Sequence, residues 1–144
     1  MLGIIRMNAY SSQDIDLKIS PDLDEYGVDA IIESSDFYVR NFTTTNTTTE
    51  HNPKFIPLSR GIGGASGKAV YERSLKVQKM FEDRIGNPSQ GIIICGGIDS
   101  GQALVERLTN YVMGVQVFTP LIFKGPKLIR ELRQILSVYN PEST

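Results

Sequence analysis

The stretch Gly91-Ile-Ile-Ile-Cys-Gly-Gly-Ile-Asp-Ser-Gly-Gln102 has three parts in a fixed order. Gly91–Cys95 is an unbroken apolar run of strand length, which is typical of a strand buried on both faces. Gly96-Gly97 follows it as a glycine turn, and Ser100-Gly101 has the residues that open a helix. The stretch therefore predicts a strand, a loop and a helix in succession.

The same order recurs along the chain. Apolar runs and turn residues predict strands near 14–19, 41–46, 91–95 and 114–118, and helices near 23–36, 68–83, 100–109 and 125–138. Repeated strand, loop and helix units with functional loops are how a (β/α)8 barrel builds its active face. A full barrel needs about 250 residues, and the chain has 144. We therefore expect an α/β fold with four parallel β/α units, half of a TIM (β/α)8 barrel whose other half is absent.

Composition narrows the classes of function. A net charge of −1 gives no argument for nucleic acid or an anionic membrane as partner. The single cysteine, Cys95, excludes an internal disulfide and a zinc cluster, so no metal site is expected. No apolar run approaches the roughly 18 residues of a membrane span. The first nine residues are a poor signal peptide, and we interpret them as a non-native start to a truncated chain.

Two glycine-rich turns are candidates for binding an anion. Gly63-Gly-Ala-Ser-Gly67 comes directly before a predicted helix and offers backbone N–H groups to a ligand, although such turns often only permit tight geometry. Gly96-Gly97 resembles it and is followed by Ser100-Gly101 at a second helix start. With Phe118-Thr119 after the last strand, it suits the phosphate site that barrels form after their final strands.

Single polar residues allow two interpretations each. Lys18 is either a lysine that protects an edge strand or a cation that faces an anionic cofactor ring. Asn46 and Thr47 are either an amide and a hydroxyl donor at the functional end of a strand or ordinary turn residues. His51, in a long polar loop, is interpreted as a solvated bystander, and Cys95 as a buried structural thiol.

The motifs together resemble a known family. Lys-Ile-x-Pro-Asp, Thr-Asn-Thr-Thr, Gly-Gly-x-Ser-Gly-Lys, Gly-Gly-Ile-x-Ser-Gly-Gln and Val-Gln-Val-Phe-Thr occur in the order of the second half of dihydroorotate dehydrogenase. The resemblance covers residues 14–138, which leaves 1–13 as a non-matching segment and 139–144 as a tail. The ending Phe118-Thr-Pro-Leu-Ile-Phe-Lys-Gly-Pro126 is similar to the membrane-associated, quinone-reducing class.

The resemblance implies a barrel with FMN at the carboxyl ends of the strands. Asn46 and Thr47 match residues that bind orotate. The positions that match contacts with FMN are Lys18, Thr45, Ser66, Gly67, Gly96, Gly97, Phe118 and Thr119. Among these, Lys18 matches a contact with the flavin ring and Thr45 another flavin contact. Ser66 and Gly67 match the loop against the flavin and its ribityl chain, and the last four match the phosphate site.

The implied reaction is the oxidation of dihydroorotate to orotate in pyrimidine biosynthesis. In the family a base removes the C5 proton, hydride passes from C6 to flavin N5, and quinone reoxidises the flavin. The base, a serine in this class, belongs to the first half of the barrel, so we expect no catalytic residue here and no activity of the chain alone. The expected partners are the missing N-terminal half or a second copy, and the implied location is the mitochondrial or bacterial inner membrane.

The chain departs from the family at several positions. Ile94 stands where the first glycine of Gly-x-Gly-Gly is usual, Phe118 replaces a tyrosine, and Asn110-Tyr111-Val112 replaces a small turn. Two alternatives stay open. One is a non-catalytic half-barrel fragment or structural subunit of a larger assembly, and the other is a different flavin barrel oxidoreductase, which the Thr-Asn-Thr-Thr motif and the ending fit less well.

Overall fold

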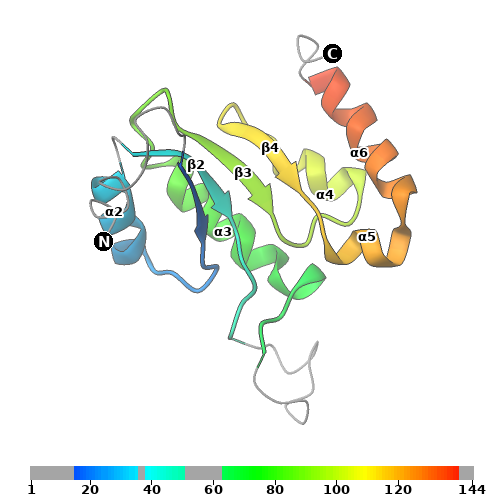
Figure 1. Ribbon diagram of the computed structural model, residues 1–144, viewed down its shortest axis with the longest axis horizontal. Helices are drawn as coiled ribbons and strands as arrows, with labels where there is room; N and C mark the ends of the chain where they lie inside the picture. The colour runs from blue at the N-terminus through cyan, green and yellow to red at the C-terminus, as the bar shows by residue number, and fades with distance from the viewer. Residues whose placement is uncertain (1–14, 36–37, 51–62, 140–144) are drawn as a thin grey trace.

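Four parallel strands form one sheet. The computed structural model describes residues 15–35, 38–50 and 63–139. The strands β1 (Ile15–Ile19), β2 (Val39–Thr44), β3 (Gly91–Cys95) and β4 (Val112–Gln116) lie side by side in the order β1-β2-β3-β4. Each neighbouring pair is parallel. The expected α/β class with parallel strands is confirmed (Figure 1).

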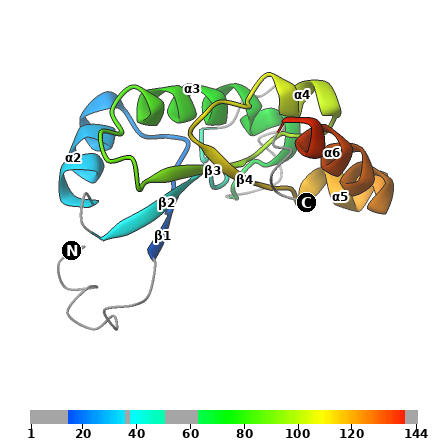
Figure 2. The same cartoon turned by 90° about the horizontal axis from the view of Figure 1, so that it is seen from above.

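The helices lie on one side of this sheet. They are α2 (Glu25–Ser35), the short 3-10 turn η2 (Gly67–Val70), α3 (Tyr71–Glu82), α4 (Gly101–Val105), α5 (Thr119–Lys124) and α6 (Pro126–Tyr139). Figure 2 shows α2, α3 and α4 along one face of the sheet, with α5 and α6 next to β4. No helix among the described residues covers the opposite face. Sequential parallel strands with one helical layer are what a segment of a (β/α)8 wall looks like.

The core lies between the sheet and its helices. Ile92 and Ile94 of β3 are fully buried, but Ile93 and Cys95 on the other face are only half-buried, so the predicted burial of both faces is wrong. Phe42 of β2 and Phe81 of α3 are also fully buried, and their rings meet with centroids 4.8 Å apart at 43°. This apolar contact fixes α3 across β2 and β3, and so fixes the loop that precedes α3.

Capping residues and a proline are found at the helix starts, where such residues are favoured. Asp24 Oδ1 accepts a hydrogen bond from the Gly27 amide at 2.8 Å and caps α2. Ser100 Oγ accepts one from the Ala103 amide at 3.2 Å and caps α4. Pro126 is the first residue of α6, where its missing N–H costs nothing.

Several predicted boundaries are wrong. β2 and β4 begin two residues earlier than expected, at Val39 and Val112. The helix predicted over 100–109 ends at Val105, and the chain then forms tight turns that place Arg107 inside the protein. The segment Thr119–Lys124, for which no helix was predicted, is helix α5. Helical periodicity alone could not show that Arg107 points inward.

β4 is an edge strand and is more exposed than its apolar sequence predicted. Met113 is 69% exposed. Large apolar side chains are also exposed on the adjoining α5 and α6, namely Ile122, Phe123, Val138 and Tyr139. The open face of the sheet also carries polar groups, with Lys18 beside Cys95 and Gln116, and Asn41 Nδ2 donating to Asp16 Oδ1 at 2.7 Å. Exposed apolar surface therefore gathers on the β4–α5–α6 flank.

The long polar loop is described only at its ends. Thr48 and Ala65 form an antiparallel bridge that brings these ends together. His51 lies outside the described residues, so its interpretation stays a prediction.

We predict that the isolated 144-residue chain self-associates through the β4–α5–α6 flank, because exposed apolar surface next to an open strand edge favours association. Phe123→Ser should weaken association by about tenfold or more, since Phe123 is 83% exposed and its loss does not disturb the core. Sedimentation equilibrium measures the change. Tyr26→Ser on α2, at a residue 84% exposed, is the matched control. A wild-type chain that is monomeric at micromolar concentration would contradict the prediction.

Candidate functional site

A pocket of about 240 Å³ lies at the carboxyl ends of the four strands. All ten residues that the sequence singled out line it: Lys18, Thr45, Asn46, Thr47, Ser66, Gly67, Gly96, Gly97, Phe118 and Thr119. They come from the ends of all four strands and from the loop before η2. Parallel strands bring their carboxyl ends to one edge, so residues far apart in sequence meet there.

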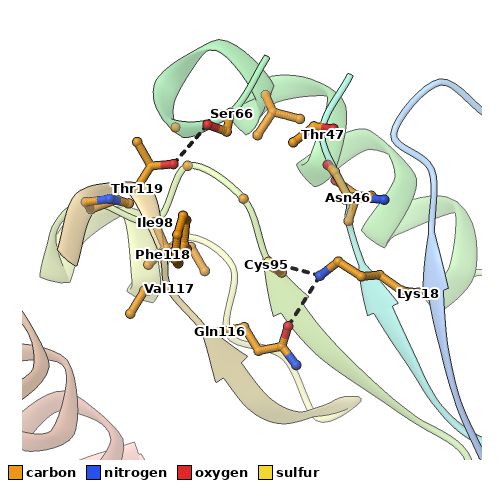
Figure 3. A pocket seen from close by; sticks show the side chains of 16 residues that line it. Lys18, Asn46, Thr47, Ser66, Cys95, Ile98, Gln116, Val117, Phe118 and Thr119 are labelled. Carbon is orange, nitrogen blue, oxygen red and sulfur yellow. Dashed lines mark hydrogen bonds between the residues drawn. The ribbon is translucent and has the colours of Figure 1, made fainter. Parts of the chain in front are cut away.

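Lys18 crosses the open face of the sheet. Its Nζ lies 3.4 Å from Gln116 Oε1 on β4 and 3.7 Å from Cys95 Sγ on β3 (Figure 3). Lys18 therefore spans from the first strand to the last at the floor of the pocket. Its ammonium group is solvent-accessible and can turn towards a bound anion.

The far end of the pocket is closed by contacts between loops. Thr119 Oγ1 donates to Ser66 Oγ at 2.9 Å, which joins the loop after β4 to the loop before η2 (Figure 3). Gly67 has φ +67° and a Cβ there would come within 3.1 Å of Thr119. Gly97 has φ +75°, and a Cβ would lie 2.6 Å from Tyr71 Cβ. Glycine is required at both turns by conformation and by space.

A carboxylate holds the loop that carries Asn46 and Thr47. Asp22, just after β1, accepts hydrogen bonds from the Thr49 amide at 2.8 Å, from Thr49 Oγ1 at 3.0 Å and from Thr48 Oγ1. Arg73 of α3 lies 3.4 Å from the same carboxylate. Burial alone would raise the pKa of Asp22, but these hydrogen bonds and the Arg73 charge outweigh it and lower the pKa. The last residue of the Lys-Ile-x-Pro-Asp motif thus positions the next loop.

A second polar network lies behind the pocket. Ser74 Oγ of α3 donates to the Cys95 carbonyl at 2.6 Å. Arg107 is fully buried, and its guanidinium donates to the carbonyls of Gly96 and Thr44 at 2.9 and 3.0 Å. Burial lowers the pKa of Arg107 to about 10, so the group is still charged at neutral pH. These bonds fix the ends of β2 and β3.

The lining is suited to an anionic ligand. Its charged side chain is the Lys18 ammonium, and no aspartate or glutamate is among the sixteen lining residues. Asn46, Thr47, Ser66 and Thr119 add neutral donors. A lining of this composition fits a phosphate or carboxylate and would disfavour a metal cation. Among the described residues, no group of His, Cys, Asp and Glu is arranged to hold a metal.

Sequence reasoning missed two polar groups in the pocket. Cys95 lines it and is half-buried, so the interpretation as a buried structural thiol is wrong. Gln116 lines it too and reaches Lys18. A signal for Gln116 was present, because an amide between Val115 and Val117 alternates with them and must face the other side of the strand.

The comparisons agree on one family. The family model described as dihydroorotate dehydrogenase matches residues 5–138, and thus begins inside the segment 1–13 that we expected to lie outside the resemblance. The chain is 35% identical over 123 residues to the dihydroorotate dehydrogenase (quinone) of Bordetella pertussis, covering 84% of the chain and 35% of that protein. It is 34% identical over 125 residues to that of Psychrobacter cryohalolentis, covering 85% and 36%.

Solved structures give the same relationship. The crystal structure of dihydroorotate dehydrogenase from Eimeria tenella in complex with ferulenol superposes with a TM-score of 0.69 at 27% identity. The match covers 89% of the chain and 34% of that protein. The ligand-free form gives a TM-score of 0.67. The chain spans about a third of the length of the relatives it matches.

We predict that Asp22→Asn destabilises the fold by about 1–2 kcal/mol at pH 7, because hydrogen bonds to a charged acceptor are replaced by weaker ones. The folded-state pKa of Asp22 lies below its unfolded value of about 3.9. Its stabilisation is therefore present above that pH and is lost as pH falls through the folded value. The difference in unfolding free energy between wild type and variant should shrink below about pH 4.

Urea unfolding followed by circular dichroism between pH 3 and 7 measures this difference. Glu33→Gln, which removes a carboxylate from an exposed position of α2, is the control. A difference for Asp22→Asn that stays constant down to pH 3 would show that the charge is not responsible.

Proposed function

Because the chain belongs to the dihydroorotate dehydrogenase family, we propose that its pocket binds FMN and one side of dihydroorotate, in a protein that oxidises dihydroorotate to orotate with a quinone as acceptor. The observation that supports this most is the pocket lining, where ten positions matching ligand contacts surround a space without a carboxylate. The relatives named dihydroorotate dehydrogenase (quinone) support the choice of acceptor. Since the chain spans about a third of their length, the activity of the whole protein is itself part of the proposal.

The phosphate end of FMN would lie between the two glycine turns. Gly96 and Gly97 line one side, and Ser66 and Thr119, already joined by a hydrogen bond, offer hydroxyl groups on the other. Phe118 and Gly67 complete this end of the pocket. When bound, FMN supplies the acceptor for the hydride of the substrate.

Lys18 would face the flavin ring. Its Nζ lies at the pocket floor, next to Gln116 and Cys95. A cation here stabilises negative charge that develops on a ring as it is reduced. Thr45, which is buried and lines the pocket beside Lys18, would hold the ring from the β2 side.

Asn46 and Thr47 would bind the substrate. Both are exposed at the pocket edge, and the Asp22 hydrogen bonds hold the residues that follow them. An amide provides a donor and an acceptor for the edge of a pyrimidine ring, and a hydroxyl can donate to a carboxylate. Together they would orient the substrate for transfer to the ring beside it.

The pocket holds no group that we assign as the catalytic base. Its lining includes no histidine, aspartate or glutamate, and the Lys18 ammonium is a donor rather than a base. We propose that the base comes from outside the described residues. We also propose association with a mitochondrial or bacterial inner membrane, where quinones reside. Among the described residues, no helix is long and apolar enough to cross a bilayer.

We predict that Ser66→Asp lowers the affinity for FMN by about tenfold or more relative to Ser66→Asn, because only the aspartate places a negative charge at the phosphate end. Ser66 is exposed, so both variants should fold. Titration of FMN fluorescence measures the affinities. Equal affinities of the two variants would place the phosphate elsewhere.

The 144-residue chain alone should bind flavin without oxidising dihydroorotate. Loss of a general base typically costs about 10²–10⁴-fold in rate, and the described pocket contains no replacement. The measurement is anaerobic reduction of bound FMN by excess dihydroorotate, followed at the flavin absorbance. Dithionite reduction of the same sample is the control for bound, reducible flavin. Full reduction by dihydroorotate within seconds would mean that a residue of this chain acts as the base.

A further inference from the structure

Arg107 is the largest of the side chains that are fully buried among the described residues, and the proposed chemistry does not use it. It follows the short helix α4 and points back towards the sheet. A buried arginine normally pairs with a carboxylate, because taking its charge out of water costs several kcal/mol. Its partners in this protein are different.

The three guanidinium nitrogens all donate to neutral acceptors. Nε bonds Gln78 Oε1 at 2.8 Å, Nη1 bonds the Gly96 carbonyl at 2.9 Å, and Nη2 bonds the Thr44 carbonyl at 3.0 Å. The Tyr71 ring lies 6.0 Å from Cζ. The positive charge is therefore hydrogen-bonded but not neutralised by direct contact with an acid.

The acidic groups around Arg107 are occupied by other donors. Glu82 accepts from Gln78 Nε2 at 2.8 Å and from Thr109 Oγ1 at 2.6 Å, and so meets Arg107 only through Gln78. Glu106 accepts from the Tyr71 hydroxyl at 2.8 Å. At the end of the glycine loop, Asp99 is 3.3 Å from Lys68 Nζ.

The guanidinium charge, which contacts no carboxylate directly among the described residues, lies directly behind the pocket. Gly96, whose carbonyl Arg107 binds, is itself a lining residue, and so is its neighbour Gly97. A charge in a buried position is screened far less than one on the surface, so its potential extends into the pocket.

We propose that Arg107 is a positioning residue that also supplies the buried positive potential for the phosphate group at the Gly96–Gly97 loop. The inference rests on the proposed binding of FMN and names the group that selects its phosphate. Arg107 does not touch the ligand, because Gly96 lies between them. It holds the loop by a hydrogen bond and attracts the dianion through space.

The test compares FMN with riboflavin, which has the same ring but no phosphate. Arg107→Met keeps the apolar part of the side chain and removes the charge. Arg107→Lys keeps the charge and loses the planar guanidinium that makes three hydrogen bonds. For even one unit of phosphate charge on the order of 10 Å away, in a medium of effective dielectric near 20, the preference for FMN over riboflavin should fall by about tenfold or more in Arg107→Met. Arg107→Lys should keep it within about threefold. Fluorescence titrations of both ligands give the ratio of affinities. A purely structural role through the hydrogen bond to Gly96 would lower this ratio in Arg107→Lys as much as in Arg107→Met.

Arg84→Met is the matched control, because Arg84 pairs with Asp29 and Glu25 at the other end of α3. It should leave the preference unchanged. An Arg107→Met variant that folds and keeps the full preference for FMN would overturn the inference.

If Arg107→Met does not fold, the inference is tested by how the preference of the wild type for FMN over riboflavin depends on salt. A preference set by a buried charge should change by less than about threefold between 0.05 and 0.5 M salt, whereas one set by the exposed Lys68 or Lys124 should largely disappear. Disappearance would overturn the inference. A wild type that binds both ligands equally would instead show that the proposed phosphate site is wrong.

Discussion

The guanidinium of Arg107 is the interaction on which the pocket depends. It binds the carbonyl that ends β2 and the carbonyl that follows β3, and so ties two strands of the sheet together at the edge where the site lies. Burying this charge is costly, and three hydrogen bonds offset the cost only while the ends of both strands stay in place. Such a network therefore favours one arrangement of the loops over any looser one.

Helix α3 links this network to the hydrophobic core. One face of the helix packs Phe81 on Phe42, and the same helix turns Ser74 and Gln78 towards the strand ends. Apolar packing sets the position of the helix without fixing its fine register. Hydrogen bonds with strict geometry then fix the register to within the tolerance that a binding site needs.

Acidic residues are abundant near the pocket but are kept out of it. Asp22 is held by Thr48, Thr49 and Arg73 at one side. On the other, Asp99 pairs with Lys68, and Glu131 accepts from the Gly101 amide at 2.6 Å. This bond and the Ser100 cap together occupy two amides at the start of α4, those of Gly101 and Ala103. The positive character of the pocket therefore arises from Lys18 inside and Arg107 behind, with each nearby carboxylate engaged elsewhere.

Much of the architecture could be predicted from the sequence alone. Strand, glycine turn and helix recur in order, and this local pattern predicted the four parallel strands. The ten residues that meet in one pocket were predicted by the resemblance of the motifs to a known family. The signals for strands, turns and helices are local, because a strand run, a glycine with positive φ or a proline at a helix start depends on neighbouring residues.

Only the tertiary structure showed the contacts between side chains that are far apart in the sequence. Lys18 meets Gln116 across 98 positions of sequence, and Arg107 meets Thr44 across 63. The early end of α4 and the exposure of β4 belong to the same class, since each depends on what packs against the segment. Side-chain type and spacing limit which groups can pair. Only the fold brings a buried charge to its carbonyl partners, because the free energy of that contact exists only when the strands are already assembled.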